Sequence, residues 1–514
     1  MNKTLLTLAF VLVQFTCFAQ APVIQWKKCF GGMYYDYGNS ILPTPDGSYV
    51  GVGYFNSING DVFGNHDLAD FWIIKLSSTG TIIWERTFGG SSGDYAYGIQ
   101  QTSDGGYIVA GFTGSNDGDV TGYHDGDGGD VWVIKLSAIG DLIWQKSLGG
   151  TGNDYVTSIL TTSNGDFLVA GTTFSNDGDV SGNHGGSDCW VVKLSAVGDV
   201  MWQKTLGGSS DDSAYSIKPT QDGGFIVAGS TLSFDGEVTG NHGGSGEDAW
   251  IVKLSATGTL VWQKTLGGTN ADTIYDIQTN SDGSFILAGY TISNDGDVVG
   301  NHGSTDAWVV QLSGTGTLLW QKTLGGTDIE WANNIQLTPD GGFIVSCDAY
   351  STNGDVTGAH GEKDAWLVKL ASNGSIMWQK AFGGTSMDGA QSVHCTSDGG
   401  YVFVGASTSL NGNVSGNHGY ADFWVVKLSA DLSFNGFEMG HVLTYPNPSH
   451  SILNIQPSNN TVIDKITITD LMGKLMLMQN SNTTQVNIEQ LASGMYMLEA
   501  VSGEDKFTCK FVKE

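Results

Sequence analysis

A tryptophan-containing segment that recurs seven times is the feature that most constrains the fold of this chain. It reads W-[QKE]-[KR]-x-[FL]-G-G, and successive copies lie 58 or 60 residues apart. A second tryptophan recurs with the same period in a D-x-W-x-[VI] segment. Such repetition predicts one structural unit stacked on the next. The two sets are Trp26, Trp84, Trp144, Trp202, Trp262, Trp320 and Trp378, and Trp72, Trp132, Trp190, Trp250, Trp308, Trp366 and Trp424.

Each unit contains four short strand patterns, which we call A, B, C and D, and no stretch with helical periodicity. In the second unit we expect them at residues 95–102, 107–113, 131–137 and 141–147, with a tight turn of the Asp-Gly kind between A and B. The B pattern is apolar on both faces, so it must lie between two other layers. The D pattern is more polar and can face water. This gradient is typical of a propeller blade.

The two ends of the repeat region complement each other. The chain opens with a lone D-type strand at 23–28, and its last unit has A, B and C patterns but no D pattern. Seven complete sets result only if the first strand completes the last sheet. We therefore predict an all-β chain: a seven-bladed β-propeller over residues 21–430, closed by the N-terminal strand. The alternative is an open β-solenoid with a frayed leading strand, which would need polar caps.

Residues 1–20 are typical of a secretory signal peptide. Lys3 provides the positive start, residues 5–13 are apolar, and the expected cut lies near Ala19 or Gln20. The chain carries 52 acidic against 22 basic residues, a formal charge of −30. Such a surface repels phosphate backbones, so we expect no nucleic-acid partner. We expect a monomeric secreted protein.

Acidic residues and histidines recur in the loops that should share one face of the propeller. The B-to-C loop reads [DN]-G-[DEN]-V-x-G-x-H, and an aspartate stands two residues before each C-strand tryptophan. One interpretation is structural: Asp, His and Trp can form a hydrogen-bonded network that pins the loop to its blade, as in WD40 blades. A second is calcium, which prefers six to eight oxygen ligands. A third is zinc, which needs three or four ligands, of which each loop supplies one histidine. The candidate calcium ligands are Asp117, Asp119, Asp177, Asp179, Asp295 and Asp297.

Ligand specificity is expected where the sevenfold pattern breaks. Trp331 is a fifteenth tryptophan, beside Glu330, and an exposed aromatic next to acids can stack on a sugar or a cation. Tyr123 with the insertion that holds Asp125 and Asp127 enriches the second B-to-C loop. We predict these five residues as ligand contacts. The alternative for Trp331 is that it fills a packing gap.

The composition changes after residue 430. Residues 431–444 are linker-like, and residues 445–514 lack tryptophan and show short β patterns expected of a small β-sandwich. The ordered motifs are Tyr-Pro-Asn-Pro at 445–448, Ile-Thr-Ile-Thr-Asp at 466–470, Leu-Ala-Ser-Gly-Met-Tyr at 491–496 and Lys-Phe-Val-Lys at 510–513.

This tail resembles the type A C-terminal sorting domain of the type IX secretion system of Bacteroidota, and the repeat units resemble those of secreted proteins of that group. The resemblance implies passage through the periplasm, export across the outer membrane, and recognition of residues 445–514 by the secretion machinery. It also implies removal of the tail, with release or anchoring at the cell surface.

Two functions remain open from the sequence. The first is an extracellular or cell-surface binding module for a glycan or a protein. The second is a hydrolase or lyase acting on an extracellular polymer. The sequence contains no G-x-S-x-G, no H-E-x-x-H and no Gly-rich phosphate loop. We therefore predict binding, with no catalytic residue and no cofactor other than calcium.

Overall fold

The computed structural model describes residues 21–66, 68–124, 126, 128–244, 246–431, 443–445, 449–456, 463–470, 474–480, 485–502 and 505–513. The predicted signal peptide and most of the predicted linker lie outside this set. The chain divides into two compact units, Met1–Ala430 and Asp431–Glu514. Every element assigned in the described residues is a β-strand. No helix among those residues is long and apolar enough to cross a bilayer.

The first unit consists of repeated four-stranded antiparallel sheets, as predicted and as expected of a propeller. We number these sheets 1–7 by their A strands. The A strands are β2 (Asp36–Pro43), β6 (Asp94–Gln101), β10 (Asp154–Thr161), β14 (Asp212–Pro219), β18 (Asp272–Thr279), β22 (Glu330–Leu337) and β26 (Ser392–Cys395). The B strands are β3 (Tyr49–Phe55), β7 (Tyr107–Thr113), β11 (Phe167–Thr173), β15 (Phe225–Thr231), β19 (Phe285–Thr291), β23 (Phe343–Ala349) and β27 (Tyr401–Ser407).

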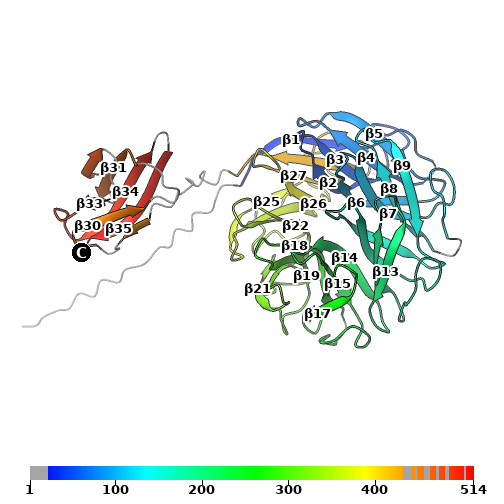
Figure 1. Ribbon diagram of the computed structural model, residues 1–514. Coiled ribbons are helices and arrows are strands. Elements are labelled where there is room, and N and C mark those ends of the chain that lie inside the picture. The colour runs from blue at the N-terminus through cyan, green and yellow to red at the C-terminus, as the bar shows by residue number, and fades with distance from the viewer. Residues whose placement is uncertain are drawn as a thin grey trace, which may run out of the picture. The chain divides into compact units, whose positions relative to one another are not determined.

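The outer half of each sheet repeats just as closely. The C strands are β4 (Asp70–Leu76), β8 (Asp130–Leu136), β12 (Asp188–Leu194), β16 (Asp248–Leu254), β20 (Asp306–Leu312), β24 (Asp364–Leu370) and β28 (Asp422–Leu428). The D strands are β5 (Ile82–Phe88), β9 (Leu142–Leu148), β13 (Val200–Leu206), β17 (Leu260–Leu266), β21 (Leu318–Leu324), β25 (Ile376–Phe382) and β1 (Ile24–Phe30). Figure 1 shows the A strands toward the middle of this unit and the D strands toward its outside.

Sheet 7 combines strands from opposite ends of the repeat region. Its order is β1-β28-β27-β26, so the first strand of the chain pairs antiparallel with the last C strand. Cys29 stands opposite Trp424 and Lys28 opposite Val425. Beyond these strands, the N–H of Ser429 donates to the carbonyl of Val23 at 2.9 Å.

Hydrophobic side chains fill the spaces between neighbouring sheets. Separate buried clusters lie between sheets 1 and 2, 2 and 3, 3 and 4, 4 and 5, 5 and 6, and 6 and 7, and one joins sheets 7 and 1. The tryptophan of each C strand is 0–2% exposed within them. Each sheet thus buries both faces only because it has a neighbour on each side.

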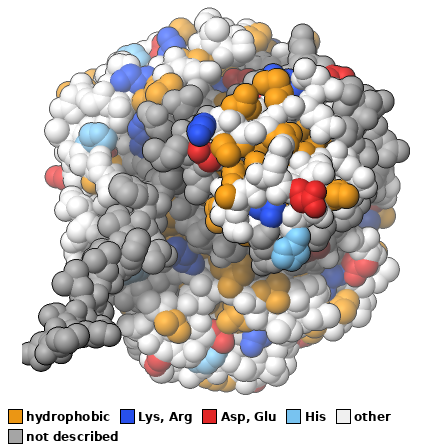
Figure 2. Space-filling view, turned by 90° about the vertical axis from the view of Figure 1, so that its left-hand side faces the viewer, with side chains coloured by type: hydrophobic (Ala, Val, Ile, Leu, Met, Phe, Trp, Pro, Cys, Tyr) orange, Lys and Arg blue, Asp and Glu red, His pale blue; other side chains and the backbone are white. Residues whose placement is uncertain are grey.

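The second unit has two sheets and its own core. One sheet joins β29 (Leu443–Tyr445), β30 (Ile452–Gln456) and β33 (Gln485–Asn487), and the other joins β32 (Leu475–Asn480), β31 (Lys465–Asp470), β34 (Gly494–Ser502) and β35 (Asp505–Lys513). The core includes Ile466, Leu498 and Phe511. Figure 2 shows hydrophobic side chains gathered on the surface of this unit. Its exposed large hydrophobic residues are Ile452, Leu475, Met476, Met478 and Met495.

Candidate functional site

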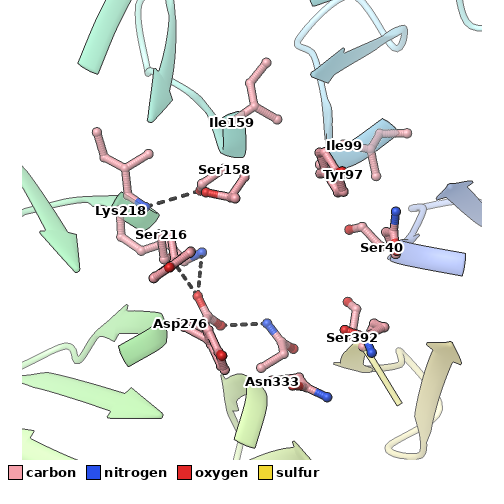
Figure 3. A pocket seen from close by; sticks show the side chains of 18 of the residues that line it. Ser40, Tyr97, Ile99, Ser158, Ile159, Ser216, Lys218, Asp276, Asn333 and Ser392 are labelled. Atoms are coloured by element: carbon pink, nitrogen blue, oxygen red, sulfur yellow. Dashed lines mark hydrogen bonds and ion pairs between the residues drawn. The ribbon is translucent and has the colours of Figure 1, made fainter. Parts of the chain in front are cut away.

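A cavity of about 780 Å³ lies among the A strands of all seven sheets (Figure 3). In sheets 1–6 the pairing of the A strand with the B strand shifts register at the same place, which marks a β-bulge. A bulge redirects the side chains that follow it. The residue after it lines the cavity, as does its counterpart in sheet 7: Ser40, Gly98, Ser158, Ser216, Asp276, Asn334 and Ser392.

Asp276 is the single acid among those seven positions, and its carboxylate joins three sheets. It is 4% exposed. Oδ1 accepts a hydrogen bond from Ser216 Oγ at 2.7 Å and lies 3.2 Å from Lys218 Nζ, both on sheet 4. Oδ2 accepts from Asn334 Nδ2 on sheet 6 at 2.6 Å. Figure 3 shows Ser216, Lys218 and Asp276 in one sector of the wall.

The position two residues further along the A strand adds two more titratable groups. Its occupants are Leu42, Gln100, Leu160, Lys218, Gln278, Gln336 and His394. Burial, with a further contribution from Lys218, lowers the pKa of His394 to about 4. The imidazole is therefore neutral at physiological pH and can both donate and accept a hydrogen bond. The wall offers the Lys218–Asp276 ion pair and one neutral imidazole among Ser, Asn and Gln side chains, together with Asp348, which pairs with Lys363.

Sequence reasoning missed Asp276, Lys218 and His394. A usable signal existed, because each occupies an A-strand position that holds a neutral residue in most other units. Period-two alternation did not reveal that these positions face the cavity, since the bulge shifts the alternation by one residue.

Trp331 lies in the cavity wall, at the A-strand position directly after the acid that begins the strand. Its ring is half-buried and meets the ring of Tyr350 edge to face, with 6.0 Å between the centroids. A half-exposed indole in a polar cavity can stack on a ligand while its partner ring fixes its orientation.

Glu330 has a different environment from the one predicted for a ligand contact. Its side chain is fully buried, and burial raises its pKa. Its carboxylate accepts hydrogen bonds from the backbone N–H groups of Gly326 at 2.8 Å and Ser351 at 2.9 Å. The acid at the start of the other A strands does the same, as Asp272 does for Gly268 at 2.7 Å. The structure therefore gives Glu330 a role in holding the loops.

The predicted loop contacts do not come together with Trp331. Tyr123 is half-buried against the core between sheets 1 and 2, and its hydroxyl donates to the carbonyl of Gly128. It supports its own loop. Asp125 and Asp127 lie outside the described residues.

The six aspartates predicted as calcium ligands form two sets with separate partners. Members of the first set accept backbone N–H groups of the preceding D-to-A loop: Asp117 from Ser91, Asp177 from Thr151 and Asp295 from Thr269, at 2.7–2.8 Å. In the second set, Asp119 accepts from Gly89 N–H, while Asp179 and Asp297 each lie 3.6 Å from a histidine Nε2. Across the described parts of the chain, no three His, Cys, Asp or Glu side chains are grouped to hold a metal ion. Calcium binding at these loops stays a prediction.

Four of the seven recurring histidines, His124, His184, His242 and His418, connect one sheet to the next. His242 Nδ1 lies 2.7 Å from Asp248 of its own sheet, and its Nε2 lies 3.6 Å from Asp297 of the following sheet. His418 of sheet 7 reaches Asp61 of sheet 1 in the same way, at 3.8 Å. The tryptophan partner differs from the predicted network, because Trp250 Nε1 donates to Gln263 of the D strand at 2.9 Å. Buried between sheets, the indole reaches the neighbouring strand and not the loop.

The second unit is the part of the chain that comparison identifies. Residues 443–514 match the family described as the secretion system C-terminal sorting domain. The chain carries a type IX sorting domain. It is therefore a protein of the kind that Bacteroidota export by the type IX route to the cell surface or the extracellular space.

Similarity outside the tail is low. Over 381 residues the chain is 24% identical to the regulatory protein FlaEY of Caulobacter vibrioides, which covers 61% of this chain. The chain spans only 39% of the length of that curated relative.

The comparison with solved structures found weak similarities. PorZ, a surface component of the type-IX secretion system of Porphyromonas gingivalis, has a TM-score of 0.42 and 13% identity, covering 94% of this chain and 60% of that one. The WD40 domain of Neurospora crassa Pan2 has a TM-score of 0.42 and 10% identity, covering 76% of this chain and 88% of that one. At these TM-scores neither likeness assigns a ligand or an activity.

Proposed function

We propose that this chain is a secreted or cell-surface binding protein. Its first unit would be a closed seven-bladed β-propeller that holds a glycan or protein ligand at the central cavity. Export through the sorting domain places such a protein where extracellular polymers and surface proteins occur.

Three observations support closure: one strand pairing within sheet 7 and two contacts between sheets 7 and 1. Strand β1 pairs with β28 over Ile24–Phe30. Val404 and Phe423 of sheet 7 share a buried cluster with Ile41 of sheet 1. His418 lies 3.8 Å from Asp61. An open array would leave the outer faces of its two end sheets exposed to water.

One observation carries the binding proposal. Charged side chains that have no equivalent in the other sheets gather in one sector of the cavity wall. The other sheets place Ser, Gly or Asn where sheet 5 has Asp276. The frame therefore does not require the Lys218–Asp276 pair. Cavities with a few convergent polar groups and an aromatic side chain, here Trp331, are typical ligand sites.

The alternative hydrolase or lyase would need a carboxylate free to exchange a proton. The cavity wall includes Asp276 and Asp348. Asp276 already contacts Ser216, Lys218 and Asn334, and Asp348 lies 2.8 Å from Lys363. Carboxylates held in this way favour binding over proton transfer.

The test is a screen of the full chain against a glycan array and a panel of extracellular proteins, followed by titration of each hit. We expect Lys218→Met and Trp331→Ala to weaken binding by about tenfold, because one lost polar or stacking contact is worth about 1.4 kcal/mol. Lys264→Met, on outer strand β17, is the matched control. Hits that both cavity variants bind as tightly as the wild type would refute a site at the cavity.

The same preparations should be assayed for new reducing ends and unsaturated products on each polysaccharide that binds. Turnover that Asp276→Asn abolishes would favour the enzyme. We expect no turnover.

A further inference from the structure

A row of contacting aromatic rings crosses sheets 1–3, and sheets 4 and 5 carry a separate group, Tyr215, Tyr275 and Tyr290. We call the row the aromatic arc; it comprises Tyr35, Tyr37, Tyr54, Tyr95, Phe112 and Tyr155. Successive ring centroids lie 4.8–6.2 Å apart. Tyr420 of sheet 7 continues it, 5.3 Å from Tyr35.

These rings are not needed to build a sheet. Tyr37, Tyr95 and Tyr155 occupy the A-strand position that holds Ser213 in sheet 4 and Thr273 in sheet 5. Tyr54 and Phe112 occupy the paired B-strand position, which holds Thr172 in sheet 3, Ser230 in sheet 4 and Tyr290 in sheet 5. Sheet 4 has small residues at both positions, yet it folds with the same strands and register, so the arc has another cause.

None of the rings is buried. Tyr420 is 62% exposed, Tyr35 45% and Tyr155 36%, and the others are half-buried. Tyr420, Tyr35 and Tyr37 are nearly parallel, with interplanar angles of 16° and 10°. Stacked carbon atoms touch at about 3.5–4.0 Å, so these larger centroid separations mean that the rings are offset. Each ring therefore covers only part of its neighbour's face.

The arc borders the central cavity. The A-strand position of Tyr37, Tyr95 and Tyr155 is filled in sheet 6 by Trp331, which lines the cavity. Tyr97, two residues after Tyr95 on the same A strand, also lines it. A chain lying along the arc would therefore end at the cavity mouth.

We infer that the aromatic arc binds an extended, uncharged polysaccharide. The axial C–H bonds of a pyranose form an apolar face that fits the negative face of an aromatic ring, and the phenol hydroxyls offer hydrogen bonds to sugar hydroxyls. A succession of rings suits a ligand that repeats. The formal charge of −30 disfavours a polyanion. This inference rests on the proposed binding function and adds the ligand class and the surface.

The experiment is affinity electrophoresis of the full chain in gels containing hydroxyethyl cellulose, laminarin, mannan or, as the polyanion, polygalacturonate. The wild type should be retarded by at least one neutral polymer. The double variant Tyr35→Ala with Tyr420→Ala should bind that polymer at least about tenfold more weakly, since the loss of stacking contacts is worth about 1.4 kcal/mol. Tyr35→Phe should retain most of the affinity because it keeps the ring.

Two controls separate the possible failures. Ser213→Ala and Thr273→Ala change the same A-strand position outside the arc and should bind as the wild type does, and thermal denaturation checks that every variant folds. Retardation by polygalacturonate alone, by none of the polymers, or equally for the wild type and the Tyr35/Tyr420 variant overturns the inference. If the cavity variants Lys218→Met and Trp331→Ala lose binding of an array ligand while the arc variants do not, the proposed function stands and the arc inference fails.

Discussion

Sheet 5 and sheet 7 have the same internal register but are assembled from the chain in different ways. Sheet 5 is one continuous stretch, β18 to β21. Sheet 7 takes three strands from residues 392–428 and its fourth from residues 24–30. Even so, Trp308 faces Thr323 in sheet 5 as Trp424 faces Cys29 in sheet 7. The register of a sheet is therefore set by side-chain packing against the neighbouring sheets, and it does not require the four strands to be continuous in sequence.

The two sheets differ in how many interactions stabilise the outer D strand, which is β21 in sheet 5 and β1 in sheet 7. In sheet 5, Trp308 Nε1 donates to Gln321 at 2.9 Å. In sheet 7, Lys27 stands at the position of that glutamine, and the buried Trp424 Nε1 has no partner within the described structure. Strand β26 also has four residues against eight in β18. Sheet 7 should therefore be the weakest of the seven.

The largest expected effect is from removing the closing strand. Deleting residues 21–30 exposes the edge of β28 and the cluster between sheets 7 and 1, so we expect a loss of at least about 5 kcal/mol, comparable with the whole stability of many domains. Urea denaturation followed by tryptophan fluorescence measures it. A variant that carries the same ten residues after Ser429, joined by a short turn, should fold. If the deletion left the unfolding midpoint unchanged, sheet 7 would not need β1.

The second effect concerns the buried acids that hold the loops. Asp272→Ala in sheet 5 and Asp388→Ala in sheet 7 should each reduce the free energy of unfolding by about 2–3 kcal/mol, because each leaves buried donors unsatisfied. Asp388 accepts from Gly384 N–H and Ser409 Oγ, both at 2.7 Å. Asp272→Glu is the control, since Glu330 performs this role in sheet 6. A loss confined to one sheet would show that the sheets are not equivalent.

The third effect is a decline in stability as the pH rises. Burial raises the pKa of Asp70 to about 6 from 3.8, and it also raises the pKa of Asp306 and Asp422. The folded state then binds more protons than the unfolded state, so the free energy of unfolding falls between pH 4 and about 6. Denaturation curves over pH 4–8 should show the fall. Asp306→Asn and Asp422→Asn should each flatten the curve, and a rise in stability over this range would contradict the assignment.

The smallest expected effect is a gain. Lys27→Gln supplies the missing acceptor for Trp424 and should raise the free energy of unfolding by about 1 kcal/mol. Gln321→Lys is the mirror experiment in sheet 5 and should lower it by a similar amount. Thermal denaturation of both variants measures the pair. If Lys27→Gln destabilised the protein, the lysine at this position would contribute more to stability than a hydrogen bond to Trp424 does.

The sequence predicts the frame well and the cavity poorly, for physical reasons. Strand B of the second unit was predicted at 107–113 and is Tyr107–Thr113, because apolar runs between glycine turns leave little choice. The sorting tail was identified because its motifs are ordered and specific. Trp331 was noticed because it is the one tryptophan outside the two repeated tryptophan positions, and it does line the cavity.

Asp276, Lys218 and His394 were missed by sequence analysis. These residues matter because their side chains face the cavity, and the sequence does not show which way they point. A β-bulge decides which side of the A strand faces the cavity, and no sequence pattern marks it. Glu330 is the opposite case: it is unique in sequence beside Trp331, yet its carboxylate accepts the same backbone hydrogen bond that aspartate accepts in the other sheets. Comparing the repeats position by position would have separated the two cases.

The central claim is that the first strand of the chain closes the seventh sheet around the cavity. Amide hydrogen exchange of the full chain, read by mass spectrometry on peptides covering β1 and β21, tests it most directly. We predict that the ladder amides of Ile24–Phe30 are clearly protected, although less than those of Leu318–Leu324, the equivalent strand of the better-held sheet 5. Exchange of β1 at the rate of an unstructured peptide, with β21 protected, would contradict closure and the cavity that depends on it.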